Sequence, residues 1–286
     1  MLIAAFGPEI PYPAYGVGTA LFKKDKNSGL NPQVIESVKT AVEAGFRHLD
    51  CAQVYGNEEE VGMALKEIDI PREKLFITSK VFDDIGDIHE ALGVSLRNIG
   101  VDYLDLFLLH TPLPFYEKNV SFEKAWSELE SELGQGRVHA IGVSNFRIKD
   151  LEPLLHIAAV KPRVNQIEFH PQVFKAAKPI LDFCKKNNII VEGYGPLSPI
   201  VRDSEGPTAQ KVRELAKKYG VSDTEILLNW CKSFGVLPIT TSSKRERMAT
   251  CLKFEKFKLE QADIDALTEL GVAHHKRIFM QHMDED

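Results

Sequence analysis

Eight short apolar runs alternate with helical patterns along this chain, and three of them end at residues that can carry a proton. Asp50, Lys80 and His110 follow such runs and lie thirty positions apart. A strand, a helix and their loops take about thirty residues, so this spacing predicts three successive parallel strands. Because the carboxyl ends of parallel strands converge at the mouth of a closed barrel, we expect the three side chains to face one another there.

The eight runs predict strands near residues 15–19, 46–50, 75–79, 104–109, 139–144, 163–168, 188–194 and 235–241. Most runs are continuous rather than alternating, which indicates strands buried on both faces. Helical patterns occupy residues 33–44, 121–133, 179–186, 208–219 and 222–232, and the last of these is extra to a minimal barrel.

An open, doubly wound sheet is the other architecture that alternating strands and helices allow. Such a sheet, when it binds a dinucleotide, carries G-x-G-x-x-G after its first strand. The run Gly16-Val17-Gly18-Thr19 lacks the third glycine of that pattern. We therefore predict an α/β fold in which residues 1–286 form a single-domain (β/α)8 TIM barrel.

Composition limits the classes of partner. The chain has 286 residues and a formal net charge of −6, which argues against nucleic acid as a main partner. No apolar run approaches the roughly 18 residues of a membrane span, and the start, Met1–Phe6, has no basic residue of a signal peptide. The cysteines lack the spacing of a disulfide framework or a metal site, so we expect a cytoplasmic protein without metal: Cys51, Cys184, Cys231 and Cys251.

Tyr55 lies five residues past Asp50 and completes a set with acid–base capacity. A tyrosine with its ordinary pKa of about 10 is a poor catalyst at neutral pH. A nearby lysine favours the phenolate and lowers that pKa, and an aspartate can hold the lysine in place. With His110 donating a hydrogen bond to a carbonyl, the set suits carbonyl reduction, in which a cofactor gives hydride and Tyr55 the proton.

Each of these residues also has an ordinary structural explanation. A lysine at a strand end is commonly a solvated charge, and an aspartate there commonly caps a helix. A histidine on an apolar strand is often a satisfied core residue, and a loop tyrosine often packs. Spacing alone leaves both interpretations open.

Four motifs make the chain resemble the aldo-keto reductase superfamily, from about Ile10 to about Leu270. They occupy residues 45–50 with 55–58, residues 104–110, residues 141–146 and residues 164–171. The resemblance implies a catalytic tetrad of Asp50, Tyr55, Lys80 and His110.

The same resemblance places a nicotinamide cofactor, which the basic residues described below indicate to be NADPH. Ser144, Asn145 and Gln166 match positions that hydrogen-bond the nicotinamide carboxamide, and Tyr194 matches the aromatic residue that stacks on its ring. The full set implied to contact the cofactor is Gly18, Thr19, Ser144, Asn145, Gln166, Tyr194, Gly195, Leu197, Ser198, Thr241, Ser242, Ser243, Lys244 and Arg247.

Two parts of that set depart from the family. Gly195 stands where a serine is usual, in a loop about one residue short. Thr241 aligns with the usual lysine of the adenosine end, but Lys244 and Arg247 still bring two positive charges to a helix start, which favours anions. We interpret them as a site for the 2′-phosphate of NADPH; the alternative is a solvated basic turn.

The expected substrate pocket differs from that of many relatives. Ala20 and Thr111 stand where tryptophan is frequent, whereas Phe82 keeps an aromatic ring. This is similar to yeast-type ketoreductases that act on small-molecule carbonyls such as α-keto amides, α-keto esters and conjugated polyketones. We expect the tail Ala273–Asp286 to close part of the pocket and the protein to be a monomer. An aldose or xylose-type sugar reductase and a nucleotide-sensing, non-catalytic binding subunit remain as alternatives.

Overall fold

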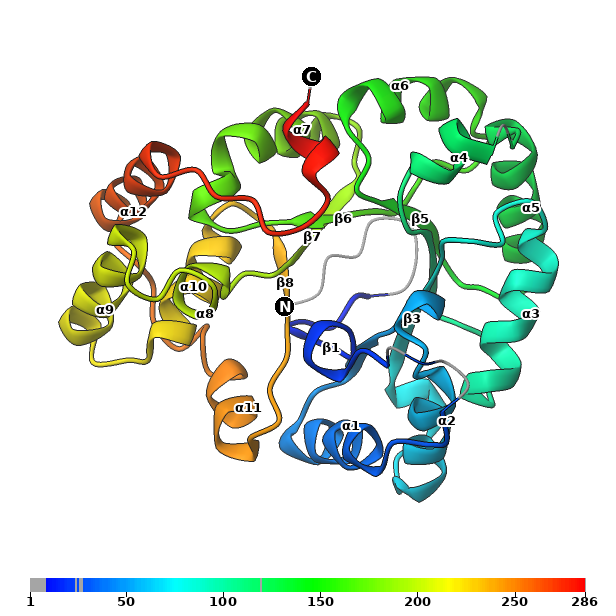
Figure 1. Cartoon of the computed structure of the whole chain (residues 1–286), viewed down its shortest axis with the longest axis horizontal. Helices are drawn as coiled ribbons and strands as arrows, with labels where there is room; N and C mark the ends of the chain where they lie inside the picture. Colours follow the sequence, from blue (N-terminus) through cyan, green and yellow to red (C-terminus); the bar gives the residue numbers. More distant parts are fainter. Residues whose placement is uncertain (1–8, 24, 26–27, 119, 286) are drawn as a thin grey trace.

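Eight parallel strands close into a barrel in the order in which they occur along the chain (Figure 1). The computed structural model describes residues 9–23, 25, 28–118 and 120–285. The strands are β1 (Ala14–Gly16), β2 (His48–Asp50), β3 (Phe76–Val81), β4 (Leu106–Leu109), β5 (Ile141–Ser144), β6 (Val164–Glu168), β7 (Ile190–Tyr194) and β8 (Leu237–Thr240). The predicted (β/α)8 barrel is confirmed.

Helices surround the barrel (Figure 1). They are α1 (Pro32–Ala44), α2 (Glu58–Glu67), α3 (Ile88–Ile99), α4 (Leu113–Lys118), α5 (Phe122–Gly134), α6 (Ile148–Ile157), α7 (Phe174–Lys186), α8 (Ser198–Val201), α9 (Pro207–Tyr219), α10 (Asp223–Ser233), α11 (Arg245–Cys251) and α12 (Gln261–Ala273). Short 3-10 helices are η1 (Thr19–Leu21), η2 (Gln53–Tyr55), η3 (Arg72–Lys74), η4 (Pro171–Val173) and η5 (Gln281–Asp284).

Local signals explain where several helices begin and end. Helix α1 starts after Asn31, whose side chain accepts from the N–H of Gln33, and ends at Gly45, whose φ of 119° suits glycine. Ser222 and Glu225 form a capping box at the start of α10.

Helix α7 differs from the sequence prediction. It begins at Phe174, so that Pro179 lies inside it rather than at its start. A proline in a helix interior removes one backbone hydrogen bond. The buried face of α7, formed by Ala177, Ile180, Leu181 and Cys184, compensates for this loss because it packs on the barrel.

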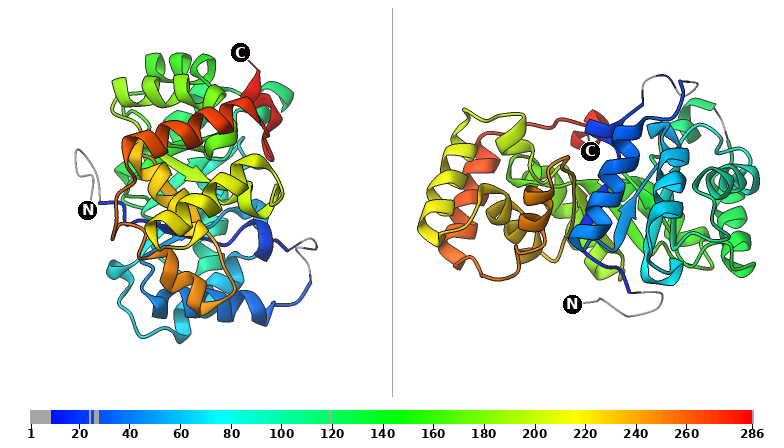
Figure 2. Two further views of the ribbon diagram at one scale, coloured as in Figure 1. Left: turned by 90° about the vertical axis from the view of Figure 1, so that its left-hand side faces the viewer. Right: turned by 90° about the horizontal axis from the view of Figure 1, so that it is seen from below.

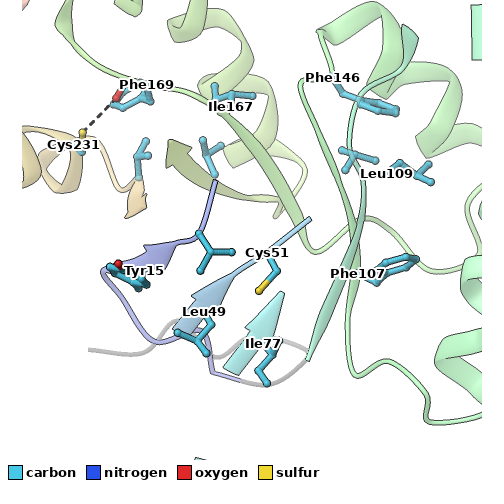
Figure 3. Packing of buried hydrophobic residues seen from close by; sticks show 14 of the residues in the cluster. Tyr15, Leu49, Cys51, Ile77, Phe107, Leu109, Phe146, Ile167, Phe169 and Cys231 are labelled. Atoms are coloured by element: carbon cyan, nitrogen blue, oxygen red, sulfur yellow. Dashed lines mark hydrogen bonds between the residues drawn. The ribbon is translucent and has the colours of Figure 1, made fainter. Parts of the chain in front are cut away.

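Alternation along the strands separates two cores. In β4, Phe107 and Leu109 join the large cluster between barrel and helices, which Figure 3 shows from close by. Leu106 and Leu108 join a smaller cluster within the barrel. Because successive side chains of a strand point to opposite faces, every second residue of each strand faces the interior of the barrel.

A tail follows α12 and crosses the barrel toward α6 and α7 (Figures 1 and 2). Within the described part of the chain, no helix is long and apolar enough to cross a membrane. Residues 1–8, which include the segment on which the expectation of no signal peptide rests, lie outside the described residues.

Candidate active site

Inward positions near the carboxyl ends of the strands are polar. Asp50 is the last residue of β2, Lys80 lies within β3, and Gln166 and Glu192 are register partners on β6 and β7. His110 follows β4 directly. Strand β3 extends two residues beyond its predicted end and includes Lys80. Lys80 is therefore a buried strand residue, and the alternative that it is a solvated charge is wrong.

Lys80 is fixed from three directions at the centre of this layer. Its Nζ lies 2.8 Å from both carboxylate oxygens of Asp50 and 2.8 Å from the carbonyl oxygen of Cys51. Lys80 is 0% exposed and Asp50 3%. Burial lowers the pKa of Lys80, but the charge of Asp50, the interaction with Tyr55 and the hydrogen bond to Asp50 together outweigh it, and the net pKa is raised. The lysine is therefore held as a cation beneath the mouth.

Tyr55 ends η2 above this pair. The ammonium of Lys80 lies 5.2 Å from the centre of its ring. Gly18 lies against the same ring: a Cβ on Gly18 would come 2.8 Å from Cζ of Tyr55, so only glycine fits there. Asn57 holds the loop by donating to the carbonyl oxygens of Val17 and Leu21.

The pKa of Tyr55 departs from the sequence expectation. Burial raises the pKa of its phenol above 10, and the charge of Lys80 lowers it by a smaller amount. The effect of Lys80 thus has the expected sign, but the net pKa is raised. Tyr55 is protonated at neutral pH, as a proton donor must be.

His110 faces Tyr55 edge to face, with ring centres 5.8 Å apart. Burial, followed by the charge of Lys80, lowers the pKa of His110 to about 3. The imidazole is therefore neutral. Its Nδ1 is buried without a partner among the described residues. Phe82 lies edge-on to the same ring at 6.0 Å.

The residues expected to hold a carboxamide do come together. Asn145, with φ of 60°, donates to the carbonyl oxygen of His110 and to Oγ of Ser144. Tyr194 donates its hydroxyl proton to Oδ1 of Asn145, at 2.8 Å. Gln166 donates from Nε2 to Oδ1 of Asp50 and to Oε2 of Glu192. One hydrogen-bonded layer thus joins the candidate catalytic and cofactor residues.

Further residues that are expected to contact the cofactor lie in two loops, after β7 and after β1. Gly195, the residue that departs from the family, has φ of 64°, a left-handed conformation that glycine adopts more readily than serine. Leu197 and Ser198 follow it at the start of α8. Thr19 and Ala20 are exposed on η1, between Gly18 and Phe22, which both lie against Tyr55.

The basic segment lies after β8. Thr241 and Ser242 are partly exposed, and Ser243, Lys244 and Arg247 are exposed. Arg245 pairs with Glu43 at 2.7 Å. The side chains of Lys244 and Arg247 have no recorded partner among the described residues, so both cations are available to an anion. The donor set fits a nicotinamide dinucleotide phosphate.

Thr111, expected to line the substrate pocket, follows His110 directly and is buried. It is 1% exposed, and its Oγ1 accepts from the N–H of Leu113 at 3.4 Å, at the turn into α4. Phe22, which the sequence reasoning did not select, is 44% exposed and lies edge-on to Tyr55 at 6.5 Å. Phe22 therefore provides an aromatic side chain beside Tyr55.

The tail is held over β6 by backbone hydrogen bonds. Glu168 accepts from the N–H groups of Ile278 and Phe279, both at 3.0 Å. The ring of Phe279 lies 5.9 Å from that of Tyr194. This position agrees with a tail that closes part of the pocket. No group of three metal-binding side chains occurs among the residues that the structure describes.

Comparisons with known proteins agree with this geometry. The profile of the Aldo/keto reductase family matches residues 15–272. The chain is 63% identical over 285 residues to the NAD/NADP-dependent indole-3-acetaldehyde reductase of Schizosaccharomyces pombe, with 100% of both chains covered. It is 37% identical to the NADPH-dependent alpha-keto amide reductase of Saccharomyces cerevisiae, over 94% of this chain and 89% of that one. The crystal structure of a Bombyx mori aldo-keto reductase in complex with NADP has a TM-score of 0.82 and 29% identity, covering 93% of this chain and 94% of that one.

Proposed function

The chain belongs to the aldo/keto reductase family, as its four motifs predict, and we propose that it reduces aldehydes and ketones through Asp50, Tyr55, Lys80 and His110. It is an oxidoreductase acting on carbonyl groups with a nicotinamide cofactor. The observation that carries the residue assignment is the buried ammonium of Lys80, fixed by both oxygens of Asp50 below the ring of Tyr55.

The four side chains divide the work of adding a hydride and a proton to C=O. When bound, the cofactor supplies the hydride to the carbonyl carbon. Tyr55 gives its phenolic proton to the carbonyl oxygen, and Lys80 stabilises the phenolate that remains. Asp50 holds Lys80 charged and in place. The neutral His110 has one N–H, which can orient the carbonyl by a hydrogen bond.

Gln166, Asn145 and Ser144 would hold the carboxamide end of the cofactor and Tyr194 the face of its ring. We propose that Lys244 and Arg247 bind the 2′-phosphate and favour NADPH over NADH. Neither side chain has a partner among the residues that the structure describes, which supports this assignment, because an arginine or lysine without a carboxylate is free to meet a phosphate. The relative from Schizosaccharomyces pombe is named for both NAD and NADP, so the preference needs direct measurement.

Two substrate classes follow from different observations. Small residues at Ala20 and Thr111, together with the 37% identical relative, support α-keto amides, α-keto esters and conjugated polyketones. The 63% identical relative is named for an aldehyde that carries an indole, and the exposed ring of Phe22 beside Tyr55 supports a planar aromatic substrate. We place both classes ahead of aldose sugars, because sugars offer no aromatic face.

We also propose that residues 1–286 form a single domain and that the protein is a cytoplasmic monomer. The four cysteines support a reducing compartment, since all are buried and free.

The proposal is tested by following NADPH oxidation with a panel of indole-3-acetaldehyde, an α-keto lactone, an isatin-type diketone and xylose. We expect turnover of the first three and little with xylose. Cofactor binding without turnover of any carbonyl would instead support the nucleotide-sensing subunit. A clear preference for xylose would overturn the substrate class and keep the catalytic assignment.

A further inference from the structure

Glu192 is a buried carboxylate in the candidate site to which the mechanism gives no role. It points inward from β7, is 1% exposed and is the register partner of Gln166 on β6. Its Oε2 accepts from Nε2 of Gln166 at 2.9 Å. Its Oε1 is buried without a hydrogen-bond partner among the described residues. A buried carboxylate with one unsatisfied oxygen is costly, so its presence calls for an explanation beyond packing.

The contact with Gln166 determines which way that amide points. Nε2 of Gln166 donates to Oδ1 of Asp50 at 2.8 Å as well as to Glu192. Asp50 is bound by Lys80 and can only accept, so the NH2 group of Gln166 must face the two carboxylates. The amide oxygen, Oε1, is then turned away from them and has no recorded partner among the described residues. It is free to accept a hydrogen bond.

We propose that Glu192 is a positioning residue which, together with Asp50, fixes the amide of Gln166 so that its oxygen receives the N–H of the cofactor's carboxamide. The inference rests on the proposed cofactor site. One carboxylate alone fixes one hydrogen of the NH2 group and leaves the amide free to tilt about that bond. Two carboxylates on different strands, β2 and β7, hold both hydrogens and leave a single orientation.

The charges around Glu192 are compatible with this role across the neutral range. Burial, and then the charge of Asp50, raise the pKa of Glu192 to about 7, while the hydrogen bond from Gln166 and the charge of Lys80 lower it. A protonated carboxyl still has an oxygen that accepts a hydrogen bond. The unpartnered Oε1 can carry the proton while Oε2 keeps its bond to Gln166, so we expect the positioning to persist on both sides of neutral pH.

Binding of two cofactor forms to the purified protein tests the inference. NADP⁺ has the carboxamide N–H, whereas its acetylpyridine analogue has a methyl group there and keeps the carbonyl. Titration by fluorescence quenching gives both dissociation constants without any turnover. We expect the wild-type protein to bind NADP⁺ about threefold to tenfold more tightly than the analogue, the range of one neutral hydrogen bond.

Glu192→Leu removes the acceptor at similar size, and we expect it to reduce this preference at least threefold. Glu192→Gln keeps an oxygen that can accept from Gln166, so it should restore most of the preference. Glu132→Leu removes a buried carboxylate of α5 that pairs with His89 on α3 and with Arg137 after α5, outside the candidate site, and serves as the matched control. Thermal melts of all four proteins confirm that they are folded.

The possible failures are distinguishable. If the wild-type protein binds neither cofactor form, the proposed function fails. If it binds both and prefers NADP⁺, but Glu192→Leu shows the same preference, the positioning role alone is wrong. Equal losses in Glu192→Leu and Glu192→Gln would also overturn it, since the accepting oxygen would then not matter.

Discussion

The interior of the barrel has two layers with opposite chemistry. The lower layer consists of inward side chains near the strand starts, which are apolar except for His48: Phe76, Leu106, Val164, Ile190 and Leu237. The upper layer consists of inward side chains nearer the carboxyl ends of the strands, and is charged and amide-rich: Asp50, Lys80, Gln166 and Glu192. Both are almost fully buried, so burial alone does not distinguish them.

The difference shows how one scaffold separates stability from chemistry. Apolar side chains in the lower layer lose contact with water at no polar cost. The upper layer keeps charges out of water, where they cost free energy unless each is paired. The charged upper layer lies where the carboxyl ends of the strands converge, as expected for a catalytic site, which needs perturbed pKa values.

We expect the largest effect on turnover from Tyr55, whose ring lies above Lys80 of the upper layer. Tyr55→Phe removes the proton donor and leaves the ring, Lys80 and the amides in place. We expect kcat to fall by roughly 10²–10⁴-fold, the usual contribution of general acid catalysis, with little change in the dissociation constant of NADP⁺. Steady-state kinetics and fluorescence titration measure the two. Retention of more than half of the wild-type kcat would show that another group supplies the proton.

Much of this upper layer follows from the sequence, because strand spacing and motif order place Asp50, Lys80 and His110 at neighbouring strand ends. Glu192 was not found by sequence reasoning. It lies between Val191 and Gly193, and its partner Gln166 is identified only by the register of two strands. The raised pKa of Tyr55 could not be predicted from the sequence either, because burial of the ring raises this pKa by more than the charge of Lys80 lowers it.

The tail and α7 were hard to foresee for a different reason. Glu168 holds the tail through backbone N–H groups of Ile278 and Phe279, and backbone groups leave no pattern in the sequence. At Pro179, the local rule against proline in a helix competes with the buried face of α7, and the packing decides. Local patterns therefore predict the elements, while contacts between distant elements decide these details.

Acid should destabilise the two layers through their histidines. Burial lowers the pKa of His48, beside Phe76, to about 4 and that of His110 to about 3, from 6.5. Both are neutral in the folded protein, whereas in the unfolded chain they take up protons below pH 6.5. Their contribution to stability is thus complete above pH 6.5 and is lost as pH falls toward 4, by up to about 3 kcal/mol for His48.

Urea unfolding at pH 7 and pH 4.5 measures this loss. His48→Gln, which cannot take up a proton, should show a smaller difference between the two pH values than the wild-type protein. An unchanged difference in His48→Gln would show that His48 is not held neutral by the fold.

A cavity in the lower layer should affect stability without affecting chemistry. Leu106 is 0% exposed and packs in the smaller apolar cluster beside its register partner Thr78, so Leu106→Ala removes packing without removing the partner of a charge. We expect a loss of about 2–5 kcal/mol in the free energy of unfolding, with kcat close to that of the wild-type protein. Urea unfolding and initial rates decide this. A loss of rate comparable to that of Tyr55→Phe would mean that the two layers are not separable.

The basic segment extends the comparison beyond the barrel interior, because the charges of Lys244 and Arg247 are exposed and have no partner within the described part of the chain. Arg247→Ala and Lys244→Ala should weaken NADPH far more than NADH, since only NADPH has the 2′-phosphate. A charge-assisted hydrogen bond contributes roughly 1.5–3 kcal/mol, or about tenfold to a hundredfold in affinity. Arg245→Ala is the matched control, because Arg245 is already paired with Glu43. If the affinities for NADPH and NADH fell equally, the segment would be a solvated basic turn and not a phosphate site.

The smallest effect we predict lies at the rim, where the upper layer meets solvent. Ala20 is exposed on η1, close to the loop that places Tyr55 and Phe22. Ala20→Trp would add an indole at the entrance and narrow the space available to a bulky cyclic diketone, while a small aldehyde still passes. Apolar contact contributes roughly 25 cal/mol per Å², so part of one indole face can change kcat/KM by about threefold to tenfold. We expect kcat/KM for an isatin-type diketone to fall by more than that for a small aldehyde, with the Kd of NADP⁺ unchanged. A variant that lowers both substrates equally would place Ala20 outside the substrate's path, and the selectivity of the mouth would then rest on Phe22 and Phe82.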